Sequence, residues 1–351
     1  MNSDFTLPCR QQLDIAAELH SLAHLDAAPA LAKRLRDYLL GAAGNGLDGL
    51  VATRLISVFN DRLTARIIEL TAARHRLPPV PWCWLALGSE GRHEQTFVTD
   101  QDNGLIFNAV SEQEAAALRQ IFLPFAQDVN QRLADCGFAL CIGQIMAGNP
   151  AWCLSLEEWR EKFIDWVRRP EPVALLNASI FFDLRPLYGD LALGERLRTL
   201  LLSMTAATPS FQHLMAANAL QVDVPLNFRG DIAVGEGDSV DLKKYGSRIF
   251  VDAARIFALA SGARAVNTAE RLRQAGPSIG LPAAEIAALG AAFSQILRLR
   301  LRQQIDAALR GETSGYGLKP AALHDIDRAI LREALKQAKR LQQRLKLNYA
   351  L

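Results

Sequence analysis

Apolar residues recur every three or four positions from Leu13 to His75. That spacing places them on one face of a helix and leaves the polar residues on the other. Breaks at Pro29 and between Gly41 and Gly49 divide the pattern. The first part of the chain is therefore predicted to form about three amphipathic helices.

The pattern changes after Pro78, Pro79 and Pro81, because a run of prolines cannot continue a helix. The residues that follow predict a strand, a second strand, a helix and a third strand in turn. The first strand is bulky and apolar and has no helical periodicity, so we expect it to be buried. The predicted ranges are Trp82–Leu87, Asp102–Phe107, Ser111–Cys136 and Phe138–Met146.

Beyond Pro150 the pattern is helical almost to the end of the chain. One apolar stripe runs from Leu242 to Ala260. It turns Lys244, Arg248 and Arg255 toward another face of the predicted helix. We therefore expect an all-helical region after the short strands.

These elements divide the chain into three predicted parts. Residues 1–78 form an N-terminal helical segment, and residues 79–155 form a small mixed sheet with its helices. Residues 156–351 form an all-α helical bundle that closes with a helix over Ile326–Leu345. The predicted fold class is α+β.

Composition narrows the classes of function. The chain has 351 residues, of which 50% are hydrophobic, so a sizeable core is available. Its 39 Lys and Arg residues nearly balance its 37 Asp and Glu residues, and the net charge is +2. This balance argues against the basic surface of a duplex-binding protein, so we expect no nucleic-acid partner and only local phosphate recognition.

Cysteine usage and hydropathy indicate the compartment. There is no CxxC pair, and the N-terminus has no basic stretch followed by an apolar core. No apolar run approaches the roughly 20 residues that span a bilayer. We expect a cytoplasmic protein with no membrane association. The five cysteines are Cys9, Cys83, Cys136, Cys141 and Cys153.

Candidate chemistry begins where the first predicted strand ends. Gly88 lets the backbone approach a ligand, and Ser89 offers a hydroxyl and an amide to a phosphate. Arg92 can neutralise charge on a leaving pyrophosphate or on the attacked phosphorus. These residues predict a turn that binds a triphosphate.

Two carboxylates follow at the start of the second predicted strand. Asp100 and Asp102 are two residues apart, so on a strand both side chains point to the same side. Mg²⁺ takes oxygen ligands and usually binds through one or two carboxylates plus substrate phosphates. The pair predicts a Mg²⁺ site, with Mn²⁺ as the alternative ion.

Each of these features also has a purely structural interpretation. A Gly-Ser pair after a strand is a common turn, and an Asp-x-Asp pair often caps a turn. The two features occur here in order, with a predicted strand on each side of the pair. This combination favours phosphate and metal binding over the structural interpretation.

The motifs together resemble those of a nucleotidyltransferase family that is related to the PII-protein uridylyltransferases. That family lies within the DNA polymerase β-like nucleotidyltransferase superfamily. The resemblance covers nearly the whole chain, most strongly Trp82–Leu301. The matching segments are Gly88–Gln95, Thr99–Asn103, Ile145–Trp152, Phe181–Arg185 with Gly189 and Asp190, Asp241–Lys243, Ala254–Ala260 and Thr268–Leu272.

The resemblance implies Mg²⁺-dependent nucleotidyl transfer. An acceptor would attack the α-phosphate of a nucleoside triphosphate, and pyrophosphate would leave. By the same resemblance Asp100 and Asp102 hold the metal, Gly88 and Ser89 hold the β- and γ-phosphates, and Arg92 balances charge. The implied fold is a polymerase β-like domain followed by a helical substrate-binding domain.

The resemblance also suggests further contacts. Gln95 and Asn103 lie in the motif segments and are candidate nucleotide contacts, as is Lys243 in the helical region. For Lys243 a solvated helix face is the alternative. Asp183, Arg185 and Arg255 are candidates for a wall of the substrate cleft. For Asp183 and Arg185, in a predicted helical stretch, an internal ion pair is the alternative.

One departure from the superfamily concerns a third carboxylate. It usually lies on the strand after the intervening helix, where it completes the metal site and acts as a base. Here the corresponding segment, Gly137–Ile145, contains no Asp or Glu. Asp135 lies just before it and could substitute, although an Asp at a helix end is more often a solvated cap.

Three hypotheses for function follow. The first is a nucleotidyltransferase in signal transduction that modifies a protein acceptor, by analogy with the uridylyltransferases. The second is a regulatory nucleotide-binding module without turnover, and the third is a helical protein-interaction module. Many relatives carry CBS or cyclic-nucleotide sensor domains, whereas residues 1–78 have room only for helices. A separate sensor protein is thus an expected partner, and the helices could also pack a homodimer.

Overall fold

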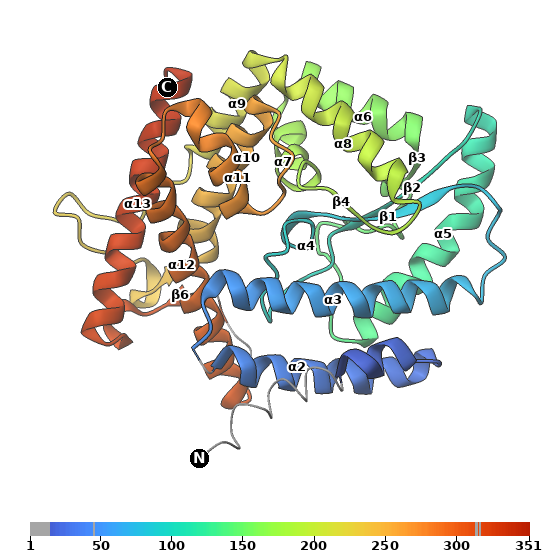
Figure 1. Cartoon of the computed structure of the whole chain (residues 1–351), viewed down its shortest axis with the longest axis horizontal. Helices are drawn as coiled ribbons and strands as arrows, with labels where there is room; N and C mark the ends of the chain where they lie inside the picture. The colour runs from blue at the N-terminus through green and yellow to red at the C-terminus, as the bar shows by residue number, and fades with distance from the viewer. Residues whose placement is uncertain (1–14, 45, 313–314, 316) are drawn as a thin grey trace. The chain divides into compact units, whose positions relative to one another are not determined.

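The computed structural model describes residues 15–44, 46–312, 315 and 317–351 (Figure 1). The predicted helix start at Leu13 and the cysteine Cys9 lie outside the described residues. The chain forms two compact units, which are described separately. Unit 1 contains residues 1–46, 54–162 and 184–198, and unit 2 contains residues 47–53, 163–183 and 199–351.

The first elements of unit 1 are helices, as the hydrophobic spacing predicts. Residues 15–21 are helical, α2 spans Ala28–Gly44, and α3 spans Gly49–Ala72. Pro29 lies in the first turn of α2, where a backbone N–H would have no partner within the helix. The apolar face of α3 is buried, with Leu63 among its covered side chains.

The sheet of unit 1 is mixed and has the strand order β3-β2-β1-β4. β1 pairs antiparallel with β2 and with β4, whereas β2 pairs parallel with β3. Ala86 at the end of β1 lies opposite Asn103 at the start of β2, so the motif segments meet at one end of the sheet. The strands are β1 (Trp82–Ala86), β2 (Asn103–Phe107), β3 (Cys153–Ser155) and β4 (Arg185–Gly189).

The helix α5 (Glu112–Asp135) packs against this sheet and confirms the helix predicted between the strands. It begins at Ser111, whose hydroxyl oxygen accepts a hydrogen bond from the N–H of Glu114. Phe122 of α5 is fully buried and stacks on Phe107 of β2, with ring centroids 5.2 Å apart. Aromatic packing therefore fixes α5 on the sheet.

The strand predicted over Phe138–Met146 is wrong. Only Ala139 of this segment makes a bridge, in parallel with Asp100, and residues 142 and 143 form a turn. Gly137 has a φ of +94° and Gln144 a φ of +56°, so the backbone cannot stay extended at either position. The segment is a loop that runs beside the residues leading into β2.

The expectation of helices alone beyond Pro150 also needs correction. β3 and β4 belong to the sheet of unit 1, and β4 begins at Arg185. Arg185 is therefore on a strand and Asp183 in a turn, not in a helical stretch. β4 is short, contains Pro186 and pairs only with β1, so its sequence lacks the long alternation that marks a strand.

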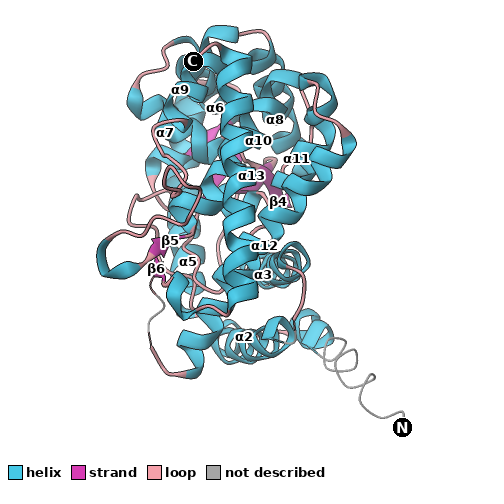
Figure 2. Cartoon of the chain, turned by 90° about the vertical axis from the view of Figure 1, so that its left-hand side faces the viewer, coloured by secondary structure: helices cyan, strands magenta, loops and turns pink. Residues whose placement is uncertain are grey.

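Unit 2 is mostly helical (Figure 2). Its helices include α7 (Pro172–Phe181), α9 (Pro209–Ala219), α10 (Arg248–Ser261), α11 (Thr268–Ala275), α12 (Ala283–Leu309) and α13 (Asp325–Tyr349). A small antiparallel pair of strands joins β5 (Val240–Asp241) to β6 (Gly317–Leu318). Helices α3, α6 (Leu156–Arg168) and α8 (Leu191–Ala206) each contain residues of both units.

The remaining elements are single turns. They are α4 (Gly88–Gly91), the 3₁₀ turns η1 (Leu25–Ala27), η2 (Pro150–Trp152), η3 (Glu236–Asp238), η5 (Gly276–Ile279) and η6 (Pro320–Ala322), and the π-helical turn η4 (Lys243–Ser247). The small mixed sheet followed by a helical bundle confirms the predicted α+β class.

Two helix faces of unit 2 differ from the prediction. Arg255 of α10 was expected on a face away from the apolar stripe, but it is 2% exposed, because it pairs with acidic residues in the interior. Ile326 was expected on the apolar face of α13 and is 75% exposed. The first buried residue of α13 is Leu331.

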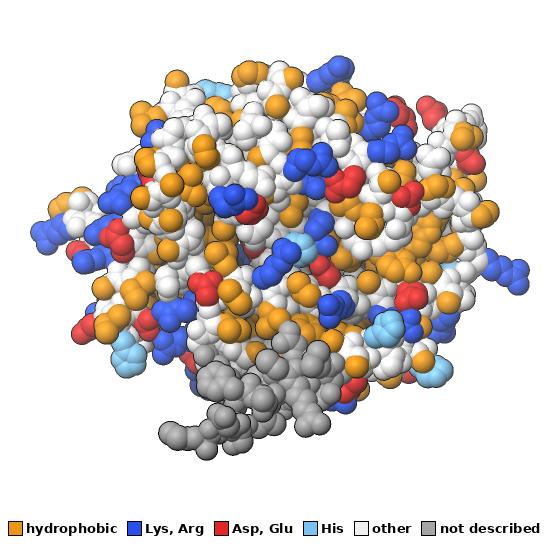
Figure 3. Space-filling view, viewed as in Figure 1, with side chains coloured by type: hydrophobic (Ala, Val, Ile, Leu, Met, Phe, Trp, Pro, Cys, Tyr) orange, Lys and Arg blue, Asp and Glu red, His pale blue; other side chains and the backbone are white. Residues whose placement is uncertain are grey.

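The surface agrees with the balanced composition. On the face shown in Figure 3, acidic and basic side chains of the described residues are interspersed. In the part of the chain that the structure describes, every helix is too short or too polar to cross a membrane.

Candidate functional site

Asp100, Asp102 and Cys141 converge at the end of the sheet where β1 leaves and β2 begins. One donor atom from each side chain lies within 4.8 Å of the donor atoms of the other two. Asp100 is exposed, Asp102 is half-buried and Cys141 is buried. The two carboxylates thus come together as predicted from their spacing, and a thiol that the sequence did not single out joins them.

Backbone hydrogen bonds hold the Cys141 loop beside the two carboxylates. The N–H of Gln101 donates to the carbonyl of Ala139 at 2.9 Å, and the N–H of Asn103 donates to the carbonyl of Ile145 at 3.1 Å. These bonds bracket Cys141 in the loop and alternate with the two Asp residues in the other segment. The convergence is therefore fixed by the backbone as well as by side-chain rotamers.

The Gly-Ser segment forms the single helical turn α4, and Gly88 opens it with a φ of +52°. A Cβ at this position would lie 2.6 Å from Oδ2 of Asp102, which is closer than real Cβ contacts allow. The N–H of Leu87 also donates to the carbonyl of Asp102 at 2.9 Å. Gly88 suits this backbone conformation, and its lack of a Cβ lets the Asp102 carboxylate approach closely.

Arg92 follows α4 directly. Its Nε donates to Oε2 of Glu94 at 2.7 Å, and the two side chains are 12% and 2% exposed. The Glu94 carboxylate balances the guanidinium charge in this covered position. Ser89 is half-buried within α4. The described geometry therefore places Gly88, Ser89 and Arg92 on one turn next to Asp102.

Gln95 and Asn103 are buried, unlike residues that contact a ligand at the surface. Each is 1% exposed. Gln95 receives a hydrogen bond from Asn60 of α3 at 3.2 Å, and its N–H donates to Ser57 of α3 at 3.1 Å. Oδ1 of Asn103 accepts from the N–H of Ala147 at 2.8 Å. Such satisfied, buried amides favour a role in holding the site loops, and direct nucleotide contact by them stays a prediction.

A charged cluster beneath α4 was not anticipated from the sequence. Nη2 of Arg185 donates to Oδ1 of Asp61 at 2.8 Å and to the carbonyl of Glu90 at 3.1 Å. Nδ1 of His93 lies 3.4 Å from Oδ2 of Asp61, without the geometry of a hydrogen bond. The cluster joins α3, α4 and β4. Residues so distant in sequence give no local signal of their contact.

Glu90 is buried in α4 near this cluster. Burial is the main cause that raises the pKa of Glu90 to about 8; the carboxylates of Asp61 and Asp102 act in the same direction, and Arg185 opposes them. A neutral carboxyl therefore lies behind the turn near neutral pH. The neighbours of Glu90 in the sequence, Ser89 and Gly91, do not predict that its side chain is buried.

Burial also raises the pKa of the Cys141 thiol, whereas the backbone amides of Ile145 and Gly143 act in the opposite direction and the nearby aspartates reinforce the rise. Asp135, considered as a substitute for the missing third carboxylate, is exposed at the end of α5 and accepts a hydrogen bond from Gln131 at 3.0 Å. It is not among the converging donors.

The candidates in unit 2 form a separate arrangement. Asp183 is fully buried and accepts hydrogen bonds from Arg255 at 2.9 and 2.7 Å and from Arg271 at 2.5 Å. The buried network is a structural role that the sequence left open as the alternative. Lys243 is exposed at the start of η4, and its N–H donates to Oδ1 of Asp241 at 2.8 Å.

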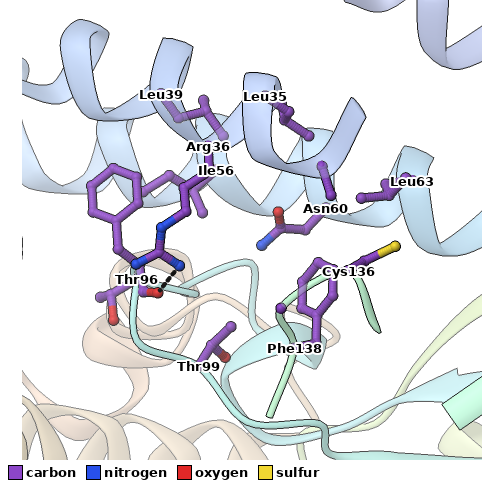
Figure 4. A pocket seen from close by; sticks show the side chains of 13 residues that line it. Leu35, Arg36, Leu39, Ile56, Asn60, Leu63, Thr96, Thr99, Cys136 and Phe138 are labelled. Atoms are coloured by element: carbon purple, nitrogen blue, oxygen red, sulfur yellow. Dashed lines mark hydrogen bonds between the residues drawn. The ribbon is translucent and has the colours of Figure 1, made fainter. Parts of the chain in front are cut away.

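A cavity of about 50 Å³ lies between α2, α3 and the loop that leads to Asp100 (Figure 4). Arg36 of α2 donates to the carbonyl of Phe97 at 3.1 Å across it, and Asn60 and Thr99 line it. Pockets for nucleotide-sized ligands usually measure about 300–1,000 Å³. This cavity is therefore too small for a nucleotide, and its polar contacts hold the loop 95–99.

Two family models match the sequence. The one described as "Putative nucleotidyltransferase DUF294" matches residues 33–173, which include the converging donors and α4. The one described as "Putative nucleotidyltransferase substrate binding domain" matches residues 209–349. Together the two ranges cover more than half of the chain. A comparison with curated proteins finds no match.

Proposed function

This chain belongs to the DUF294 family of nucleotidyltransferases, and from that premise we propose that it transfers a nucleoside monophosphate from a nucleoside triphosphate to a protein acceptor. The observation that carries the proposal is the convergence of Asp100 and Asp102 next to α4, within the matched range. Dependence on Mg²⁺ or Mn²⁺ and a role in signal transduction are parts of the same proposal.

The donor set suits a divalent ion, because Asp100 and Asp102 offer carboxylate oxygens at an accessible position. When bound, such an ion would polarise the phosphate oxygens and draw off charge from the triphosphate. Gly88 admits the backbone close to the ligand, and Ser89 offers its hydroxyl and amide to the β- and γ-phosphates. Arg92 lies on the same turn, where it can balance charge on the leaving group.

In the proposed reaction an acceptor oxygen attacks the α-phosphorus. The bond from that phosphorus to the bridging oxygen breaks, pyrophosphate leaves with the bond electrons, and the acceptor hydroxyl loses its proton to solvent. Asp100 and Asp102 would hold the divalent ion, which when bound would help to orient the reacting phosphate against the attacking oxygen. The described residues thus supply positioning and charge balance, which are the main requirements of phosphoryl chemistry.

The acceptor class rests on analogy. We propose kinship with the PII-protein uridylyltransferases and the polymerase β-like superfamily, because the ordered motifs around Gly88 and Asp100 resemble theirs. Residues 79–155 would act as the catalytic domain and residues 156–351 would hold the acceptor, in line with the family description of residues 209–349. A separate sensor protein and a homodimer remain proposed partners.

A nucleotide-binding regulatory module is the second candidate function. It is favoured by one observation, the absence of a third carboxylate among the donors that converge in the described part of the chain. Such a module would bind triphosphate and metal but release little pyrophosphate.

The test is calorimetry of the four ribonucleoside triphosphates with Mg²⁺, followed by an assay for pyrophosphate release with candidate acceptor proteins. We expect the wild-type chain to bind one triphosphate and the Asp100→Asn/Asp102→Asn variant to lose that binding. Asp135→Asn is the matched control, because Asp135 is exposed and outside the converging donors.

The outcomes separate the candidates. Binding with pyrophosphate release supports transfer, whereas binding without release under all acceptors supports the regulatory module. A folded wild-type chain that binds no triphosphate would exclude both and leave the interaction module as the surviving hypothesis.

A further inference from the structure

Cys141 is the sulfur donor beside the two aspartates. Its Sγ lies within 4.8 Å of a carboxylate oxygen of Asp100 and of Asp102, and the residue is 6% exposed. The other described cysteines, Cys83, Cys136 and Cys153, lie in strands or at a helix end and are not in this donor group. The position of Cys141 is therefore specific to the site.

The loop is built to present this sulfur. A turn closes behind it, with the N–H of Gln144 donating to the carbonyl of Cys141 at 2.9 Å. A Cβ at Gly143 would lie 3.6 Å from Sγ of Cys141, so the turn passes close to the sulfur. Groups that pack around a ligand atom in this way hold it in place beside the other ligands.

The donor spacing suits one metal ion. Typical bond lengths are about 2.3 Å to sulfur and about 2.0–2.2 Å to a carboxylate oxygen. Two donors of one ion therefore lie up to about 4.5 Å apart. The donor atoms here all lie within 4.8 Å of one another, and the Asp100 side chain is exposed, so rotation of that side chain can bring its carboxylate onto a shared ion.

We propose that Cys141 is the third ligand of the metal centre, so that the site binds divalent ions that accept sulfur, namely Mn²⁺, Co²⁺ and Zn²⁺, more tightly than Mg²⁺. A thiolate replaces the third carboxylate of the superfamily, and ligand softness then selects the ion. The thiol proton is released to solvent on binding, one for each ion bound. The inference rests on the proposed function only for the role of the ion in transfer.

The test is a titration of the full, metal-free chain with Co²⁺ alone. We expect one equivalent to produce the near-ultraviolet charge-transfer absorption of a thiolate-to-cobalt bond. Cys141→Ser should lose this absorption and bind Co²⁺ at least about 10–100-fold more weakly. Cys136→Ser is the matched control and should retain both the absorption and the affinity.

A second variant tests the selectivity. Cys141→Asp supplies a hard oxygen in place of sulfur, so calorimetry should show a shift of preference toward Mg²⁺ relative to Mn²⁺. The inference is overturned if the folded wild-type chain shows no thiolate band at saturating Co²⁺, or if Cys141→Ser retains the band. It is also overturned if Cys141→Asp leaves the order of preference unchanged.

These results are independent of the triphosphate assays. A Cys141-dependent cobalt band in a chain that binds no triphosphate would uphold the metal centre and reject the proposed function. If the wild type and Cys141→Ser transfer equally well with Mg²⁺ and neither shows the cobalt band, the proposed function is upheld and the Cys141 metal centre is rejected.

Discussion

A side chain at position 88 would occupy the space of the Asp102 carboxylate. Gly88→Ala combines a φ of +52° with a Cβ that would lie 2.6 Å from Oδ2 of Asp102. We expect the free energy of unfolding to fall by about 1–3 kcal/mol. The free energy of metal binding should weaken by more than this, because the Asp102 carboxylate must move. Thermal unfolding and a Mn²⁺ titration measure the two effects.

Gly262→Ala provides the matched control for backbone strain. Gly262 has a φ of +67°, and nothing lies within 4 Å of the Cβ it would gain. It should lose stability to a similar extent and keep the metal affinity of the wild type. Equal metal affinity in Gly88→Ala would contradict the close approach at Asp102.

Glu90 gives the site a predictable pH dependence. Its pKa is raised from 4.5 to about 8 in the folded chain, mainly by burial. Below pH 4.5 the carboxyl is protonated in both states, so its titration changes nothing. Between 4.5 and about 8 the unfolded chain loses the proton while the folded chain keeps it, and stability falls as pH rises. Above about 8 the penalty is constant.

Glu90→Gln should therefore increase the free energy of unfolding at pH 8 and change it little near pH 4.5. The expected gain at pH 8 is on the order of a few kcal/mol, at about 1.4 kcal/mol for each unit of pKa difference. Urea unfolding at several pH values measures it. Glu161→Gln removes an exposed carboxylate as the control, and a gain for Glu90→Gln that is independent of pH would count against the burial argument.

At the level of single residues, a site residue could be predicted from the sequence only where its partners are close to it in the chain. Asp100 and Asp102 were predictable because two residues on an extended segment share one side. Cys141 was not, because its partners come from a different segment and its chemistry shows only once the loop is placed. Gln95 and Asn103 belong to recognisable motifs, but their burial depends on α3 and on the Ala147 loop.

At the level of elements, β4 anchors the turn that carries the motif. Arg185→Ala removes hydrogen bonds to Asp61 and to the carbonyl of Glu90. We expect a loss of about 1.5–3 kcal/mol, since both bonds involve a charged donor. Hydrogen exchange should show faster exchange of amides in α4, with α5 unchanged.

Arg185→Lys is the conservative control, because it keeps the positive charge and N–H donors but loses the planar fork of the guanidinium. It should restore part of the protection in α4. If Arg185→Ala leaves the α4 amides as protected as in the wild type, β4 does not hold the turn.

β4 also shows why some strands cannot be predicted from the hydrophobic pattern. β1 and β2 are buried, apolar and near the motifs, so their composition was enough to predict them. β4 contains a proline and a glycine among its five residues, so its strand conformation depends on pairing with β1. The Phe138–Met146 segment has strand-like composition, but Gly137 just before it and Gln144 within it have positive φ angles, and the segment folds into the loop that carries Cys141.

At the scale of the whole molecule, the buried ion network of unit 2 ties α7, α10 and α11 together. Asp183→Asn would remove the carboxylate that Arg255 and Arg271 share in the interior, while Arg255 would keep its ion pair with Asp252. We expect a loss of about 3–5 kcal/mol, because removing one member of a buried ion network leaves buried charge uncompensated. Urea unfolding of the full chain measures it. Glu157→Gln, which removes an exposed ion pair with Arg160, should have little effect.

The chain passes between its two units five times, after residues 46, 53, 162, 183 and 198. A break anywhere between residues 47 and 198 therefore leaves pieces of both units on either side. A recombination junction before β4 would separate that strand from the other three strands of the sheet, and a junction after residue 198 would carry residues 47–53 and 163–183 of unit 2 along with the sheet. Any exchange that moves the whole sheet therefore also moves part of unit 2.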